Sequence, residues 1–109
     1  MDKDTQEKIT KLQMMEQNLQ NLLAQRPQFT TQLAEIEGAV KELDTKEPVY
    51  KLVGNILVKS EPAKLKEELS QKKELVELRI KSLEKQENQM RDRSSQLKEE
   101  VMKTISKEQ

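Results

Sequence analysis

The chain contains no cysteine and no histidine, and its only glycines are Gly38 and Gly54. Without cysteine there can be no disulfide, no thiolate metal site and no cysteine nucleophile. Without histidine the sequence lacks the commonest general base and the commonest metal ligand. Two isolated glycines cannot form a Gly-rich phosphate-binding loop. We therefore expect that the protein is not an enzyme and uses no cofactor or metal.

Apolar residues are also scarce. They make up 33% of the 109 residues, and Phe29 and Tyr50 are the only aromatic ones, whereas an ordinary globular chain is roughly 45–50% apolar. So little apolar surface cannot offset the entropy lost in forming one compact core, which leaves long helices with narrow apolar seams, or disorder. No apolar run approaches the roughly 18 residues of a membrane span, and the first residues form no apolar signal-peptide core. We expect a cytoplasmic protein with no membrane contact.

Charged residues are abundant and balanced. They make up 37% of the chain, and 20 Lys and Arg against 20 Asp and Glu give a net charge of zero. The two signs are interleaved, whereas a nucleic-acid footprint needs clustered Lys and Arg. The sequence therefore predicts no nucleic acid as a partner.

The first segment, residues 5–44, carries the heptad pattern of a coiled coil. Apolar residues alternate at spacings of three and four over about five heptads, which predicts a helix with one narrow seam. One line of the seam is Leu12, Leu19, Arg26, Leu33 and Val40, and the other is Met15, Leu22, Phe29, Ile36 and Leu43. The alternative is an amphipathic helix on a globular core, although such helices rarely exceed roughly 25 residues. At Pro27 we expect a kink rather than a break, because the seam keeps its phase on both sides.

Residues 49–59 change to the pattern of β-strands. Valine, isoleucine and leucine dominate the segment on both sides of Gly54 and Asn55. These two residues suit the turn of a β-hairpin, with glycine first as a type II′ turn prefers. Pro62 follows the segment and suits the first turn of another helix.

The third segment, residues 62–107, is predicted to be a second long helix. Its clearest apolar stripe recurs every seven residues and consists of Leu69, Val76, Leu83, Met90 and Leu97. The companion line is mostly polar and consists of Leu65, Lys72, Arg79, Gln86, Arg93 and Glu100. We expect these long side chains to lay their aliphatic stems on the seam and to keep their polar ends in water.

The two helical segments have nearly equal lengths, and the turn lies at the centre of the chain. Partners across the hairpin, such as Val53 and Ile56, have residue numbers that add to 109. Folding the helices about the same point sets the two strongest stripes against each other. The predicted fold class is therefore mainly α, a long antiparallel coiled-coil helical hairpin with one short β-hairpin between the helices. We expect residues 1–109 to form a single domain.

The predicted β-hairpin has no core within the chain to cover it. A lone two-stranded hairpin is marginal in water, and an exposed apolar edge promotes aggregation. We therefore expect the hairpin to complete a sheet with strands from other chains. The predicted oligomerisation residues are Val49, Tyr50, Leu52, Val53, Ile56, Leu57 and Val58. The alternative is that the hairpin folds back as a cap on the helix ends.

The end of the coil remote from the hairpin holds further apolar residues, some of them outside the seam. Helix ends fray, so these side chains are exposed intermittently, and flexible methionines suit the binding of many partners. The residues predicted for this binding surface are Ile9, Leu12, Met14, Met15, Leu19, Leu97, Val101, Met102 and Ile105. The alternative is that they only close the end of the coil.

A helix, one short hairpin reading PVYKLVGNILVKS at residues 48–60, and a second helix together resemble a β-class subunit of prefoldin, of the subunit-6 or archaeal β type. The resemblance covers the whole chain, and the hairpin motif is its most specific part. It implies a hexamer of two α-class and four β-class subunits, whose hairpins assemble into β-barrels. It also implies that the tips of the coiled coils hold unfolded client proteins without nucleotide and pass them to a group II chaperonin.

The expected function is therefore that of one subunit of a holding chaperone. The alternative is a structural or adaptor coiled-coil subunit without chaperone activity, which would need no buried hairpin and would bind its partner specifically.

Overall fold

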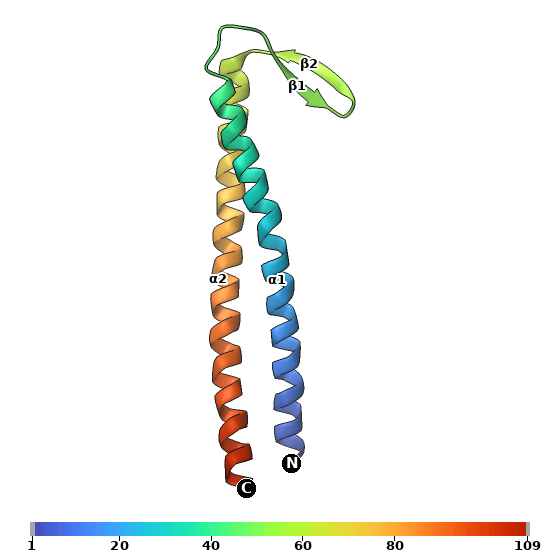
Figure 1. Cartoon of the computed structure of the whole chain (residues 1–109), viewed down its shortest axis with the longest axis vertical. Coiled ribbons are helices and arrows are strands. Elements are labelled where there is room, and N and C mark those ends of the chain that lie inside the picture. The colour runs from blue at the N-terminus through green and yellow to red at the C-terminus, as the bar shows by residue number, and fades with distance from the viewer. Residues whose placement is uncertain (1, 109) are drawn as a thin grey trace. The chain divides into compact units, whose positions relative to one another are not determined.

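The computed structural model describes residues 2–108 as two long helices with a β-hairpin between them (Figure 1). The elements are α1 (Lys3–Glu42), β1 (Val49–Val53), β2 (Ile56–Ser60) and α2 (Pro62–Glu108). The predicted fold class is confirmed, although α1 begins and ends two residues earlier than expected. Over the part of the chain that is described, neither helix has an apolar stretch long enough to cross a membrane.

The early start of α1 has a local cause, because Asp2 caps the helix. Its Oδ1 accepts a hydrogen bond from the backbone N–H of Thr5 at 2.7 Å, and its carbonyl accepts one from the N–H of Gln6 at 3.1 Å. Hydrogen bonds from Thr5, first from the side chain and then from the backbone, hold the pKa of the Asp2 carboxyl below its ordinary value. A carboxylate also suits the positive end of the helix dipole.

The described residues divide into two compact units. Unit 1 contains residues 2–27 and 81–108, and unit 2 contains residues 28–80 with the hairpin. In each unit a segment of α1 lies antiparallel to a segment of α2 (Figure 1). Lys8 pairs with Glu100 at 3.6 Å in unit 1, and Lys73 pairs with Glu37 at 3.7 Å in unit 2. The residue numbers of these pairs add to 108 and 110, within one residue of the predicted register.

Pro27 lies inside α1, and the helix continues through it. The prediction that proline does not break this helix is confirmed, and the predicted kink stays a prediction. Pro27 also stands at the boundary between the two units.

The seam of α1 agrees with the heptad prediction. All ten of its positions are buried or half-buried, and Ile36 and Leu43 are the most deeply buried of them. On α2 the buried apolar residues are Leu65, Val76, Leu83 and Val101. Leu83 has no exposed surface at all, so the clearest stripe of α2 does face α1.

The companion line predicted for α2 is not the buried line beyond Leu65, although Arg79 does lie over the ring of the seam residue Phe29, with its Cζ 5.8 Å from the ring centroid. Lys72, Arg79, Gln86, Arg93 and Glu100 are exposed, and the positions one residue further along are buried or half-buried instead: Lys73, Ile80, Glu87, Ser94 and Val101. The seam advances by four residues twice in succession, from 65 to 69 and from 69 to 73, before threes and fours alternate. Such an extra step of four shifts the phase of a heptad pattern. At two positions the shift removes an apolar side chain from water in place of a charged one, since Ile80 is half-buried and Val101 buried whereas Arg79 and Glu100 are exposed. At position 87 it has the opposite effect and buries a carboxylate.

The β-hairpin has the predicted register and turn. β1 and β2 pair antiparallel, with Val49 opposite Ser60 and Val53 opposite Ile56. Gly54 has φ of 61°, and no residue other than glycine has a positive φ among those described. A positive φ at the first turn residue alone is the geometry of a type II′ turn. As predicted, α2 then begins at Pro62.

Candidate functional site

The hairpin exposes its apolar side chains to solvent. Six of the seven predicted oligomerisation residues are between 46% and 67% exposed, namely Tyr50, Leu52, Val53, Ile56, Leu57 and Val58, and Val49 is half-buried. Neighbouring residues of a strand point to opposite faces. Because Leu52 and Val53 are both exposed, both faces of the hairpin are uncovered. The single chain therefore shows no capping of the helix ends by these side chains.

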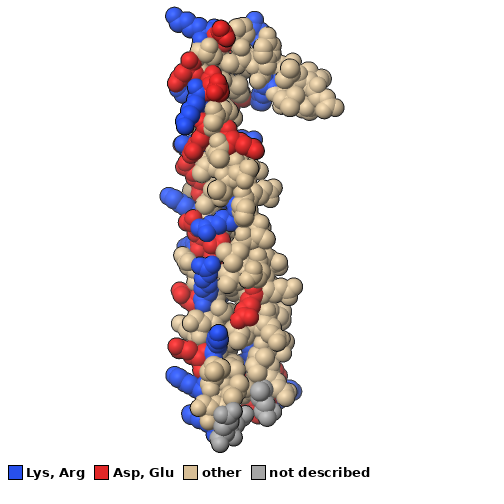
Figure 2. All heavy atoms as spheres, viewed as in Figure 1, with Lys and Arg blue, Asp and Glu red and all other residues tan. Residues whose placement is uncertain are grey.

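One ion pair connects the hairpin to the start of α2 within unit 2. Lys51 Nζ lies 3.0 Å from Glu68 Oε2, and both side chains are largely exposed. An exposed pair of this kind contributes little to stability. In the space-filling view the outer part of the hairpin carries no charged side chain (Figure 2). The outer part of the hairpin thus presents an uncharged surface on this face, whereas Lys51 and Lys59 add positive charge elsewhere on the strands.

The predicted binding surface at the end of the coil lies in unit 1, where the start of α1 and the end of α2 run side by side (Figure 1). Two of its residues are freely accessible, Met14 at 61% exposure and Met102 at 59%. The half-buried ones are Ile9, Leu12, Met15, Leu19, Leu97 and Ile105, and Val101 is buried. The side chains most available without any opening of the coil are therefore the two methionines outside the seam, and the half-buried residues are accessible in part.

A charged cluster occupies the seam of unit 1. Nη1 of Arg26 lies 3.5 Å from Oε2 of Glu87, and Nη2 bonds to Oε1 of Glu84. The hydrogen bond to Glu84 is the main cause of a raised pKa at Arg26. Glu87 is only 2% exposed, and its Oε1 has no hydrogen-bond partner among the described residues. Sequence reasoning identified Arg26 as the polar seam residue but missed Glu87, because the seam of α2 was assigned one residue out of phase.

Two exposed leucines on α2 were also not identified from the sequence. Leu75 and Leu78 are 68% and 63% exposed. They are three residues apart, so they share one face of the helix. They lie outside both lines of the seam, and a search for seam positions alone does not identify them. Unit 2 therefore carries exposed apolar side chains on its helix as well as on its hairpin.

Comparison with known proteins gives consistent matches over nearly the whole chain. Residues 6–108 match the family described as prefoldin subunit. The chain is 40% identical over 101 residues to the prefoldin subunit beta of Archaeoglobus fulgidus, which covers 90% of this chain and 87% of that protein. It is 36% identical over 104 residues to the prefoldin subunit beta of Methanothrix thermoacetophila, covering 92% and 86%. The crystal structure of the prefoldin beta subunit from Thermococcus strain KS-1 matches with a TM-score of 0.87 at 27% identity, covering 94% of this chain and 93% of that one.

Proposed function

The chain belongs to the prefoldin subunit family, a family of chaperone subunits rather than enzymes, and from that membership we propose how it works. Prefoldin subunits form hetero-oligomeric complexes. We propose that this chain is a β-class subunit of a cytoplasmic hexamer, with α-class and other β-class subunits as partners. The hexamer captures unfolded proteins at the ends of its coiled coils without nucleotide and delivers them to a group II chaperonin.

The uncovered hairpin is the observation that carries this proposal. Apolar side chains are exposed on both of its faces, and burying such surface stabilises an interface by roughly 25 cal/mol per Å². A two-stranded hairpin gains stability when further strands join its edges. Strands from neighbouring subunits would supply both the missing edges and the missing cover, which supports assembly through the hairpin.

The end of the coil supports the proposed capture of unfolded chains. Met14 and Met102 are exposed there, and flexible thioether side chains adapt to apolar surfaces of many shapes. Local opening is cheapest at helix ends, so half-buried neighbours such as Leu12 and Leu97 can join the contact. Several weak contacts on one oligomer then hold one client through avidity. Nothing in this mechanism needs nucleotide hydrolysis.

The proposed capture is tested by removing the exposed apolar groups while keeping the coil intact. We expect the oligomer with Met14→Gln and Met102→Gln to suppress aggregation of chemically denatured citrate synthase less well than the unmodified oligomer, measured by light scattering. The matched control is Leu75→Gln with Leu78→Gln, which removes equally exposed apolar groups from unit 2. Native mass spectrometry establishes beforehand that both variants assemble.

Equal suppression by the methionine variant and the unmodified oligomer would contradict capture at the coil end. An unmodified oligomer that assembles but suppresses no aggregation would favour the adaptor alternative.

A further inference from the structure

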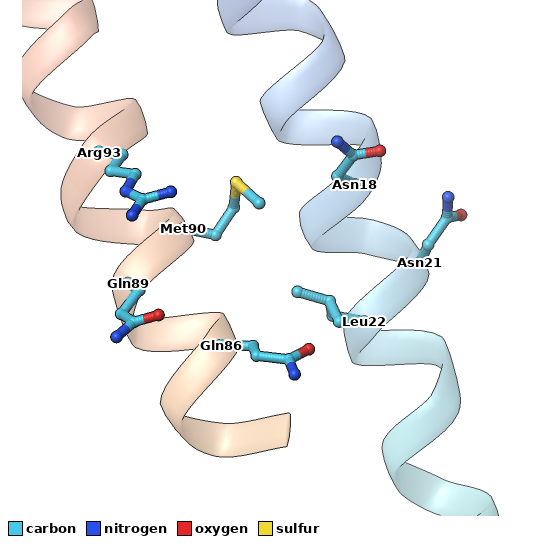
Figure 3. Close-up of a pocket in the computed structure, with 7 residues that line it drawn as sticks. All are labelled: Asn18, Asn21, Leu22, Gln86, Gln89, Met90 and Arg93. Atoms are coloured by element: carbon cyan, nitrogen blue, oxygen red, sulfur yellow. The ribbon is translucent and has the colours of Figure 1, made fainter. Parts of the chain in front are cut away.

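Unit 1 contains a groove between its segments of α1 and α2. The groove lies several helical turns from the start of α1. The groove has a volume of about 460 Å³, and its apolar floor consists of Leu22 and Met90. Figure 3 shows Leu22 pointing from α1 toward α2, and Met90 pointing from α2 toward α1. Both are half-buried, so the seam is partly open to solvent along this side.

Four carboxamides also line the groove. They are Asn18 and Asn21 from α1 and Gln86 and Gln89 from α2. In Figure 3 Gln86 points toward α1, whereas Asn21 points away from α2. All four are exposed, and none makes a side-chain hydrogen bond within residues 2–108. Each carboxamide offers two donor hydrogens and one acceptor oxygen. The groove therefore combines a small apolar floor with a rim of hydrogen-bonding groups that bond to no other described residue.

The helix segment that supplies half of this rim is unusually poor in charge. Arg26 is the only charged residue between positions 17 and 34, in a chain that is 37% charged. On the opposite wall, Arg93 makes no ion pair within the described part of the chain. The four carboxamides of the rim are uncharged, and Arg93 adds one positive charge to the wall formed by α2.

The groove continues toward the end of the coil. A second groove of about 460 Å³ shares Met90 and Arg93 with the first, and adds Met15 and Leu97 to the apolar floor. From Leu22 to Lys11 the two grooves together follow about 16 Å of helix. An extended peptide advances roughly 3.3 Å per residue, so about five residues fit.

We propose that this carboxamide-rimmed groove binds an extended segment of an unfolded polypeptide through its backbone. Peptide N–H and C=O groups match the donors and acceptors of the four carboxamides, and client side chains of varied shape meet the flexible Met15 and Met90 on the floor. The groove adjoins the coil-end surface, so a client held at Met14 or Leu97 can extend along it. The inference rests on the proposed capture of unfolded chains, and it adds a site for the client backbone.

The test replaces the rim and keeps the floor. The variant Asn18→Ala, Asn21→Ala, Gln86→Ala, Gln89→Ala removes the carboxamides, and alanine favours the helix at each position. The matched control, Gln13→Ala, Gln17→Ala, Gln20→Ala, Asn88→Ala, removes four exposed carboxamides that do not line the groove. The probes are a labelled unstructured peptide of alternating leucine and serine, and the same peptide methylated on alternate backbone nitrogens. Fluorescence anisotropy with the assembled oligomer gives each affinity.

We expect the rim variant to bind the unmodified peptide about tenfold more weakly than the control variant does, the loss that one or two net hydrogen bonds produce. The methylated peptide should bind the unmodified oligomer weakly, and its affinity for the rim variant should equal its affinity for the control variant. Equal affinity of both variants for the unmodified peptide would overturn the inference while leaving capture at the coil end intact. An altered oligomer mass in the rim variant would also overturn it, because the groove would then be a contact between subunits. If the unmodified oligomer binds neither peptide, the proposed capture itself fails.

Discussion

Arg26 and Glu87 show how single charged residues are accommodated in an apolar seam. Glu87 is buried, and its nearest described charge is Arg26, with Nη1 and Oε2 separated by 3.5 Å. Arg26 keeps part of its side chain in water and also bonds to Glu84. A buried carboxylate is costly unless it is paired, whereas replacing a buried pair with apolar side chains is often neutral or stabilising. We therefore expect the cluster to contribute more to the choice of helix register than to the stability of the coil.

This reading predicts a non-additive pair of substitutions. Arg26→Met leaves the Glu87 carboxylate buried without its partner, and we expect it to lower the free energy of unfolding. Adding Glu87→Leu removes the stranded charge and should restore most of that loss. Denaturant unfolding followed by circular dichroism measures both variants. Additive destabilisation by the two changes would contradict the pairing.

The cap at Asp2 predicts a pH dependence confined to the start of α1. Hydrogen bonds from Thr5 depress the pKa of Asp2 below its ordinary 3.8. The cap therefore stabilises the folded state above that value, and its contribution disappears as the pH falls through the lower folded pKa. We expect the Thr5 amide proton shift, followed by NMR, to titrate with a midpoint below 3.8. Asp2→Asn should abolish the titration, and a midpoint at or above the ordinary value would contradict the cap.

At the scale of elements, the β-hairpin was predictable in detail and the second helix only in part. The hairpin depends on local chemistry, since Gly54 supplies the positive φ that the turn requires. The seam of α2 does not depend on local chemistry alone. Its extra four-residue step and the buried Glu87 are resolved only by the opposite helix, so a regular heptad assigned Arg79 to the seam instead of Ile80.

Replacing each of the two glycines with alanine should change the stability of the protein in opposite directions. Neither has a neighbouring atom within 4 Å of an added Cβ, but Gly54 has a φ of +61° whereas Gly38 lies within α1. Gly54→Ala should therefore destabilise the protein by about 1–2 kcal/mol through backbone strain. Gly38→Ala should stabilise it by up to about 1 kcal/mol through helix propensity. Thermal unfolding of the assembled protein compares them, and shifts of the same sign would contradict this assignment of the turn.

At the scale of the whole molecule, the hairpin surface, the coil-end surface and the groove differ in how far each can be predicted from the sequence. The hairpin surface follows from an apolar segment with no core to cover it. Exposure of Met14 and Met102 follows from their positions outside the seam. The carboxamide-rimmed groove does not follow from the sequence, because a heptad pattern treats Asn21 and Gln89 alike as solvated positions. Only the two helices together place them along one groove.

Assembly through the hairpin predicts that one acidic substitution there removes the oligomer. Leu57 is 67% exposed in the single chain, so Leu57→Asp should leave the helical content nearly unchanged. Buried in an interface, the unpaired carboxylate costs several kcal/mol, and native mass spectrometry should show loss of the proposed hexamer. Leu75→Asp, at a residue that is 68% exposed on α2, is the control and should still assemble. A hexamer that survives Leu57→Asp would show that the hairpin does not hold it together.

The central claim is that assembly and client capture use different surfaces of the chain. Hydrogen–deuterium exchange of the assembled oligomer, with and without a chemically denatured client, tests this claim most directly. The account predicts that amides of β1 and β2 are protected by assembly alone and do not change when the client is added. It predicts that residues 9–23 and 97–105 gain protection only with the client, because binding closes helix ends that otherwise open locally. Client-dependent protection in the hairpin, with none at the end of the coil, would contradict it.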